Sequence, residues 1–374
     1  MPRRAQAARA GTPPLRKGKA IADAGRPNTS SPLSIRVRRH PLITAFAKAL
    51  HGPCGVTPGS RVVLGVSGGA DSSSLLLAAA TLAQRKSSRI QPIVVHVHHH
   101  LRREADDDEA FVRDLAARFE LPFAAAHVRL ERRIGGRSRP NSTNLLALAR
   151  RRRYAALARV AREHDACAVA TAHHLDDQCE TVLMHLFRGC DLDGLVGMPW
   201  RRNLATGVSL IRPLLGVRRA ACEELCRAAG VTWRDDPSNR DANRARAMLR
   251  HSIMPRIETL WPGAAEHVAA TAQAVGAWRR SMDESVRRLF GEASCASWSR
   301  AALAAAPPAI VMAGLRRTAA TMNAAAAPTR RHLDAAAEAI ADVQRRPRSF
   351  NWPGNLQLSI TSKHVMLRVE KLDR

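Results

Sequence analysis

The clearest pattern in the sequence is an apolar stretch, then a run of small polar residues, then a second apolar stretch with good helix formers. Residues 62–66 are mostly β-branched or apolar, residues 67–74 are small or polar, and residues 75–82 are mostly apolar. This order predicts a buried strand, a tight turn and a helix. Apolar and polar segments go on alternating, and they predict further strands at residues 93–98, 123–130, 166–172 and 210–215. The intervening segments predict helices at residues 105–120, 145–164 and 174–188.

Strands that alternate with helices at this spacing predict an α/β fold with a doubly wound parallel sheet, Rossmann-like in type. Beyond residue 217 the pattern is mainly helical, and alternating apolar residues at 356–360 and 365–369 predict a small terminal β-hairpin. We therefore expect four parts. They are a disordered basic tail at 1–40, an α/β domain at 41–216, a helical substrate-binding region at 217–345, and a hairpin end at 346–374, which would be a reduced C-terminal domain.

Composition narrows the choice of partners. The chain has 374 residues and a formal net charge of +27, which favours a polyanionic partner such as RNA over a merely solvated basic surface. Aromatic residues make up only 4%, so phosphate contacts rather than base stacking must supply most of the binding. The seven cysteines include no CxxC pair, which gives little support for a zinc or iron–sulfur site and favours a reducing, cytoplasmic location. No apolar run is long enough for a membrane span, so we expect no membrane partner.

The small residues after the first strand form a candidate phosphate-binding loop. A strand, a glycine turn and a helix together present backbone N–H groups to an anion at the helix N-terminus. Glycine lets the backbone approach a phosphate closely, and the serines add hydroxyl donors. No Gly-Lys-Ser/Thr closes the loop, so it is not a Walker loop. The candidate residues are Ser67, Gly68, Gly69, Ala70, Asp71 and Ser72.

Two further clusters follow predicted strands and are expected at the same sheet edge. His96 and His98 share one face of their strand, where a nucleotide pocket is the preferred interpretation and a metal site is the alternative. His173 and Asp177 are four residues apart, which on a helix places one above the other and directs both into the pocket. A carboxylate there can hold an ammonium group or Mg²⁺, and a histidine can move a proton; the alternative is that the acids only favour the helix N-terminus.

Two groups of arginines are candidates for phosphate contact. Arg150 and Arg153 belong to a run of four arginines before Tyr154, and a run of that length covers every face of a helix. Arg246 and Arg250 are four residues apart and follow the turn sequence at 236–241. An ordinary solvated helix face is the alternative for the first group.

The motifs together resemble the tRNA(Ile)-lysidine synthetases, within the PP-loop class of N-type ATP pyrophosphatases. In order along the chain they read SGGADS, HVHHHLR, ARRRRY, HHLDDQCET, RGCDLDGLVGM, RPLL and DPSNRD…RAMLR. They span residues 60–255, and seven ordered motifs are far more specific than the loop alone. The chain departs from the family pattern at His100, where glycine is usual, and at Leu146, Arg244 and Ala247.

The resemblance implies a ligase that forms a C–N bond on tRNA. ATP, with Mg²⁺, would adenylate the wobble cytidine of the CAU-anticodon tRNA(Ile), and free L-lysine would then displace AMP. Residues 67–72 would bind ATP, and Asp71, His173 and Asp177 would be catalytic, with Asp71 or Asp177 holding the metal. His96 and His98 would line the adenosine pocket, Arg150, Arg153, Arg246 and Arg250 would hold tRNA, and the protein would form a homodimer. The alternatives are another PP-loop enzyme, such as a 2-thiolation enzyme, or a non-catalytic RNA-binding relic.

Overall fold

The computed structural model describes residues 33–86, 89–100, 105–128, 142–190, 192–234, 245–291, 296–323, 328–344 and 346–369. The chain divides into two compact units, which we describe separately. The first unit comprises Met1–Cys190 with Gly197–Ala270, and the second comprises Asp191–Val196 with Thr271–Arg374.

The first unit is built on a six-stranded sheet in the order β3-β2-β1-β4-β6-β5. Five strands are parallel, namely β1 (Arg61–Gly65), β2 (Gln91–His98), β3 (Phe123–His127), β4 (Ala168–Ala170) and β6 (Val208–Ile211). The edge strand β5 (Arg201–Ala205) pairs antiparallel with β6. Strands β2 and β3 extend the sheet on one side of β1, and β4 begins the other side. The order therefore reverses between β1 and β4, which is where ligands bind in folds of this type.

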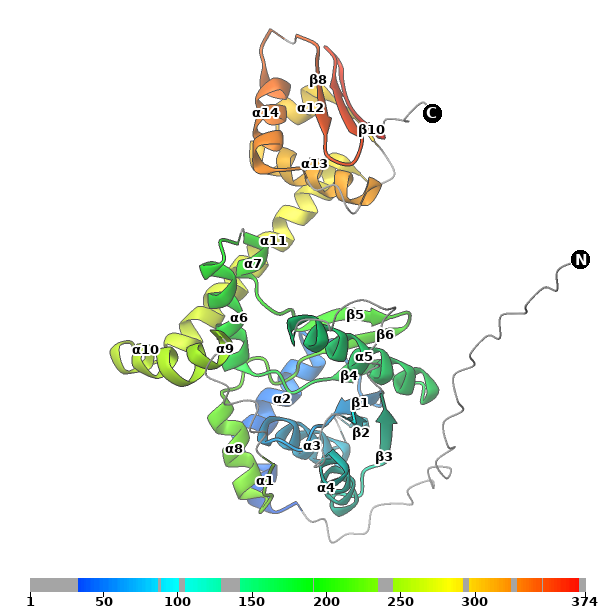
Figure 1. The fold of residues 1–374 in the computed structure, drawn as a ribbon, viewed down its shortest axis with the longest axis vertical. Coiled ribbons are helices and arrows are strands. Elements are labelled where there is room, and N and C mark those ends of the chain that lie inside the picture. The colour runs from blue at the N-terminus through cyan, green and yellow to red at the C-terminus, as the bar shows by residue number, and fades with distance from the viewer. Residues whose placement is uncertain are drawn as a thin grey trace, which may run out of the picture. The chain divides into compact units, whose positions relative to one another are not determined.

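Successive residues of the central strand face two different hydrophobic cores. Val62 and Leu64 pack with residues of α2 (Pro41–His51), α3 (Ala70–Ala83), α4 (Ala105–Arg118) and α8 (Arg219–Ala228). Val63 packs instead with residues of α5 (Ser142–Glu163), on the opposite face. Helices thus cover both faces of the sheet (Figure 1), which confirms the predicted doubly wound fold.

The first unit contains further helices, which come after strands β4 and β6 in the sequence. Helix α6 (Leu175–Phe187) comes after β4, and α9 (Ala245–Met248), a π-helical turn at Leu249–Ile253 and α10 (Met254–Leu260) follow one another directly. Leu175 and Cys179 of α6 pack against Ala265 and Ala269 at the start of α11 (Ala264–Phe290).

The second unit combines helices with a four-stranded sheet in the order β7-β10-β9-β8. Its elements are α7 (Leu192–Leu195), most of α11, β7 (Ser297–Ser299), α12 (Arg300–Ala304), α13 (Pro308–Met322), α14 (Arg330–Ala341), β8 (Arg348–Trp352), β9 (Leu356–Ile360) and β10 (His364–Val369). The predicted hairpin is confirmed as β9 and β10, whose alternate residues Leu356, Leu358, Val365 and Leu367 are buried.

Several predicted boundaries differ from the structure. The predicted tail at 1–40 is too long, because Leu33 and Val37 are buried and α1 (Ile35–Arg38) is helical; residues 1–32 lie outside the described residues. Strand β6 ends at Ile211, so the predicted extension to residue 215 is wrong and residues 213–216 form a turn. Strands β5, β7 and β8 were not predicted, because their polar residues mask the alternation on which a strand prediction depends.

Within the described part of the chain, no helix combines the length and the apolar character that crossing a membrane requires.

Candidate functional site

The phosphate loop, residues 67–72, connects β1 to α3 and is held by its own serines. The Ser67 N–H donates to Ser72 Oγ at 3.2 Å, and Ser72 Oγ donates to the Gly69 carbonyl at 3.0 Å. Gly69 is the N-cap of α3, and no side chain caps the helix there. The N–H groups of the first turn therefore remain available to an anion, as the sequence predicts for a phosphate site.

The two glycines of the phosphate loop have different roles. Gly68 has φ of +92°, a left-handed conformation, and a Cβ there would lie 3.3 Å from Phe111 Cδ1. Gly69 has φ of −74°, which any residue adopts, and a Cβ there would meet only the Arg234 carbonyl oxygen at 3.8 Å. The fold thus requires glycine at position 68, whereas at position 69 the backbone has room for a side chain.

Asp71 lies in the first turn of α3, beside the loop. Its Oδ1 atom is buried and has no hydrogen-bond partner among the described residues, although Arg219 Nε lies 3.9 Å away. Its Oδ2 atom lies 3.6 Å from His174 Nε2. This contact joins the phosphate loop to the cluster after β4, so the predicted meeting of these two segments at one sheet edge is confirmed.

His174 is fully buried and is surrounded by three carboxylates. Its Nε2 lies 3.6 Å from Asp71 and 3.4 Å from Asp177, and its Nδ1 lies 3.5 Å from Asp176. Burial by itself lowers the pKa of His174, but Asp176, Asp71 and Asp177 outweigh it and raise the pKa to about 10. The Asp177 N–H also lies 3.2 Å from Nδ1, a contact that only the neutral ring accepts. The protonated ring instead directs Nδ1–H to Asp176.

The predicted helical relation between His173 and Asp177 is wrong. Helix α6 begins at Leu175 with His174 as its N-cap, so His173 precedes the helix. His173 bonds instead to Thr171 Oγ1, at 2.9 Å from Nδ1. Burial lowers the pKa of His173 to about 3; Asp177 opposes this shift, and Arg212 adds to it. His173 is therefore neutral at physiological pH.

Asp177 and Glu180 form ion pairs with both predicted tRNA-binding arginines of the 246–250 segment. Asp177 Oδ1 lies 3.1 Å from Arg246 Nη2 and 2.8 Å from Arg250 Nη2. Glu180 is 2% exposed and accepts from Arg246 Nε at 2.7 Å and from Arg250 Nε at 2.6 Å. Burial acts to raise the pKa of Asp177, but His174 and the arginines outweigh it, so its pKa lies below the usual range. This paired set is close to neutral in total charge.

A second group of arginines surrounds Tyr154 on α5, and we call it the arginine cluster. Its members are Arg150, Arg153, Arg202 and Arg212. The guanidinium carbons of Arg150, Arg153 and Arg202 lie 5.2–5.4 Å from the centre of the Tyr154 ring, within range of a cation–π interaction. Arg212 is 3% exposed, and burial lowers its pKa. The Nε atoms of Arg153 and Arg212 and the Tyr154 hydroxyl are buried without a hydrogen-bond partner in the described part of the chain. Such a group is suited to an anion.

His96 and His98 both lie on β2, but they have different surroundings. His96 is buried beside the phosphate loop, and its Nδ1 lies 3.0 Å from the Val66 carbonyl oxygen, to which it donates. Burial lowers the pKa of His96. His98 lies further along the strand, where its Nε2 contacts Asp106 at 3.0 Å. Of the two histidines, only His96 has a described contact with a residue next to the phosphate loop. A nucleotide pocket lined by both histidines stays a prediction.

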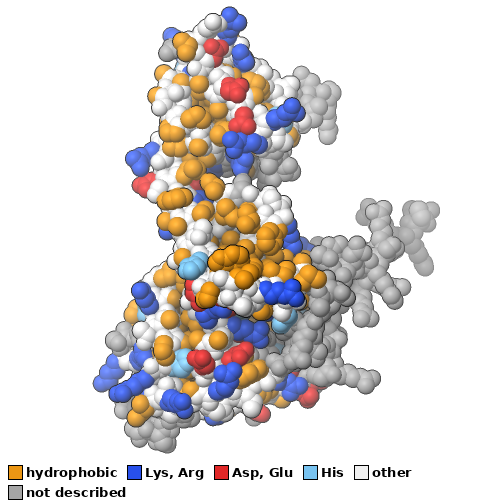
Figure 2. Space-filling view, turned by 90° about the vertical axis from the view of Figure 1, so that its left-hand side faces the viewer, with side chains coloured by type: hydrophobic (Ala, Val, Ile, Leu, Met, Phe, Trp, Pro, Cys, Tyr) orange, Lys and Arg blue, Asp and Glu red, His pale blue; other side chains and the backbone are white. Residues whose placement is uncertain are grey.

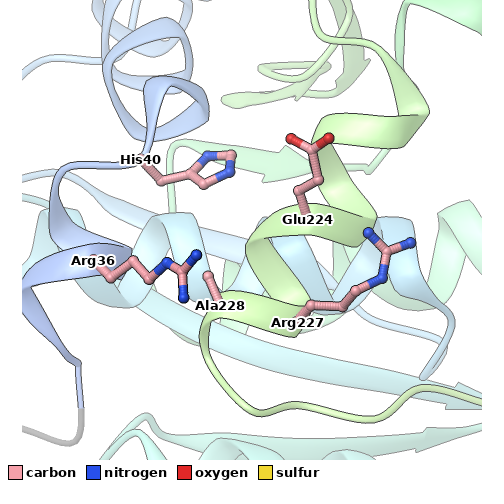
Figure 3. Close-up of a pocket in the computed structure, with 5 residues that line it drawn as sticks. All are labelled: Arg36, His40, Glu224, Arg227 and Ala228. Atoms are coloured by element: carbon pink, nitrogen blue, oxygen red, sulfur yellow. The ribbon is translucent and has the colours of Figure 1, made fainter.

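Two cavities of about 330 Å³ each lie in the first unit. One is lined by groups of both charges, including Asp176, Glu180, Arg218, Arg250 and Glu258. The other lies between α1, the start of α2, and α8. Figure 3 shows His40 and Glu224 directed into this second space. None of the predicted site residues lines this cavity between α1, α2 and α8.

Positive charge is distributed over the face of the molecule that Figure 2 shows. Figure 2 shows Lys and Arg side chains spread across one face, with acidic side chains among them, rather than one basic patch. The turn sequence at 236–241 and Arg244 lie outside the described residues.

A doubly wound sheet with an uncapped helix N-terminus at its switch point defines a nucleotide-binding α/β protein. The family model described as the PP-loop domain matches residues 42–257, and the chain belongs to this family.

Several curated relatives of the chain are described as tRNA(Ile)-lysidine synthase. The chain is 37% identical over 235 residues to the tRNA(Ile)-lysidine synthase of Geobacter sulfurreducens, and the match covers 62% of this chain and 48% of that protein. It is 40% identical over 153 residues to the enzyme of the same description from Pseudomonas putida, covering 40% of this chain and 35% of that one. The chain thus spans less than half the length of these curated relatives.

Among solved structures, the fold is similar to that of the U34-tRNA thiolase NcsA from Methanococcus maripaludis. The TM-score is 0.52 at 17% identity, and the match covers 63% of this chain and 78% of that chain. At this identity the likeness concerns the fold alone.

The site contains residues that were not predicted, among them Asp176, His174, Glu180, Arg202 and Arg212. His174 and Glu180 lie within the quoted motif HHLDDQCET, but only the cap at His174 and the burial of Glu180 distinguish them from their neighbours. Arg202 and Arg212 join the arginine cluster from β5 and from the end of β6. The sequence RPLL singled out Arg212 as part of a motif without indicating its neighbours.

Proposed function

We propose that this chain carries out the lysidine synthase reaction in the cytoplasm. ATP adenylates the 2-oxygen of the wobble cytidine in the CAU-anticodon tRNA(Ile), pyrophosphate leaves, and the amine of free L-lysine then displaces AMP. The seven ordered motifs, the PP-loop family and the description shared by the curated relatives support this proposal.

The observation that carries the proposal is the uncapped first turn of α3 beside Asp71 and His174. The free N–H groups at Gly69–Asp71 would hold the phosphates of ATP, and Ser67 and Ser72 would add hydroxyl groups. Because His96 donates to Val66, its Nε2 retains a lone pair for the adenosine side of the pocket.

Asp71 fits a Mg²⁺ ion better than Asp177 does. Oxygen ligands suit this cation, and Asp71 Oδ1 is buried without a hydrogen-bond partner among the described residues. Both arginines of the 246–250 segment already occupy Asp177 Oδ1. When bound, the ion would neutralise phosphate charge.

Lysine would approach from the side of His173 and Asp177. His173, with its low pKa, is neutral and can accept a hydrogen bond from the attacking amine. Asp177 would attract the ammonium group, in competition with its two arginines. The cavity lined by Asp176, Glu180, Arg218 and Arg250 carries both signs of charge, as a free amino acid does.

The tRNA backbone would contact Arg150 and Arg153, to which the structure adds Arg202 and Arg212 as candidates. Arg246 and Arg250 remain candidates, but each already pairs with a carboxylate, so their contribution to phosphate binding would be smaller.

The test is mass spectrometry of the wobble nucleoside of CAU-anticodon tRNA(Ile) after incubation with the protein, ATP and lysine. We expect a lysine adduct that requires both small molecules. Pyrophosphate release without lysine incorporation would indicate another PP-loop reaction, and the absence of both would indicate a non-catalytic RNA-binding protein.

A further inference from the structure

Three histidines meet at one end of the sheet, two from neighbouring strands and one just past a strand end, and we call them the histidine cluster: His98, His127 and His100. His98 and His127 are the last residues of β2 and β3 and lie directly opposite each other in the parallel register. Residues in register on adjacent strands direct their side chains to the same face. The sheet itself therefore brings two imidazoles together.

His100 completes the cluster through an unusual backbone conformation. It has φ of +53°, in the left-handed region that favours glycine, and this turn directs its ring back over the strand ends. The centre of the His100 ring lies 4.1 Å from the centre of the His98 ring and 5.1 Å from the centre of the His127 ring. A non-glycine residue in this conformation is uncommon, and here it places a third imidazole against the other two.

The nitrogen positions fit a metal ion. One nitrogen from each histidine lies within 4.8 Å of the other two, and His127 Nδ1 is 3.2 Å from His100 Nε2. Zn–N bonds of about 2.0–2.1 Å in a tetrahedral site place two nitrogen ligands roughly 3.4 Å apart.

Carboxylates lie next to the outer nitrogens of two of these rings. Glu109 Oε2 is 3.6 Å from His127 Nε2, and Asp106 Oδ1 is 3.0 Å from His98 Nε2. Arg113 holds the other oxygen of Glu109. Carboxylates in this position orient metal-bound histidines and fix the tautomer. Two hydrogen bonds oppose metal binding. His98 Nδ1 accepts the His100 N–H at 3.2 Å, and His127 Nδ1 and His100 Nε2 share a proton across 3.2 Å; both bonds must be exchanged for the ion.

We propose that His98, His100 and His127 form a binding site for a divalent transition-metal ion of the zinc type. Three imidazoles and no thiolate suit Zn²⁺, with the fourth position left to water. The ion would link the ends of β2 and β3. This assignment gives His98 to the metal ion in place of its predicted position in the adenosine pocket, and it does not depend on the proposed reaction.

The test is titration of the full-length, tag-free protein with Co²⁺ and Zn²⁺. Tetrahedral Co²⁺ gives visible absorption bands, and ligation by thiolate adds near-ultraviolet charge transfer, so a cysteine site is distinguishable from a histidine site. We expect one Co²⁺ per chain without thiolate charge transfer, displaced by Zn²⁺. We also expect Zn²⁺ to raise the melting temperature by mass action.

His100→Gly is the sharpest variant, because glycine adopts the +53° conformation without strain and the fold should be retained. We expect it and His127→Gln to weaken Co²⁺ binding at least tenfold. His251→Gln, a change at an exposed histidine outside the cluster, should leave binding unchanged. Equal Co²⁺ affinity in the wild type and in both cluster variants would overturn the proposal, as would a spectrum dominated by thiolate ligation.

Discussion

Arg250 and Glu180 form a two-pronged ion pair across 70 residues of sequence, with Nε 2.6 Å from Oε1 and Nη2 2.9 Å from Oε2. Glu180 is 2% exposed, so its charge depends on this pairing. The pair connects α6 to the π-helical turn at Leu249–Ile253. It thereby fixes the helix whose first turn carries Asp177.

Removal of Glu180 should destabilise the first unit. Glu180→Ala leaves Arg246 and Arg250 with Asp177 alone. Breaking a fully buried ion pair costs about 3–5 kcal/mol, and the loss here should be smaller because the Arg246 and Arg250 side chains are 41% and 24% exposed. Urea unfolding of Glu180→Ala, Arg250→Ala and the double variant measures the coupling between the two side chains. Additive losses would show that the pair contributes no coupling of its own.

The two loop glycines should respond differently to alanine. Gly69→Ala should retain the melting temperature but lose most pyrophosphate release, because the new methyl group enters the space needed by a phosphate and not the protein core. Gly68→Ala should lower the melting temperature, since φ is +92° there. Thermal denaturation and a pyrophosphate assay on both variants provide the comparison. Normal pyrophosphate release by Gly69→Ala would remove the loop from the proposed ATP site.

Asp177→Asn should separate the two proposed half-reactions. Asp177 lies outside the phosphate loop, so adenylation should survive better than lysine capture, and the lysine concentration needed for half-maximal rate should rise. Pyrophosphate release and lysine incorporation are measured on the same sample, with the exposed Asp165→Asn as control. Equal loss of both activities, with an unchanged melting temperature, would contradict a role specific to lysine.

His174 should make stability depend on pH in the alkaline range. Its pKa is raised from 6.5 to about 10 in the folded protein, so its contribution is complete below about pH 6.5 and is lost as the pH rises through about 10. His174→Asn supplies an N-cap acceptor and removes the charge. The difference in unfolding free energy between wild type and variant should shrink across this range. A constant difference would show that His174 does not gain a proton on folding.

The affinity for tRNA should fall steeply with salt, by tenfold or more between about 50 and 200 mM if several phosphates are contacted. Arg150→Ala should flatten the slope of log K against log salt by about one unit. Arg246→Ala removes the same charge but should change the slope less, because Glu180 already pairs with that guanidinium. Filter binding at several salt concentrations measures both. Equal slopes for all three proteins would exclude Arg150 from phosphate contact.

Local pattern by itself determined the strand, loop and helix around residues 67–72. Strand and helix periodicities and the requirement for small residues act over a few positions, so the sequence displays them directly. The same holds for the order of elements, from which the doubly wound fold and the shared sheet edge followed. The family motifs were also evident from sequence, because they occur in one order along the chain.

Only the tertiary structure decided which side chains pair. His173 and Asp177 have helical spacing, but the helix begins one residue after His174, so the cap and not the period determines their relation. Arg246 and Arg250 read as a basic stripe, yet core packing brings them to Asp177, 69 and 73 residues away, where pairing lowers the cost of burial. His98 and His127 meet because β2 and β3 pair in that register, and no local pattern encodes the register of two parallel strands.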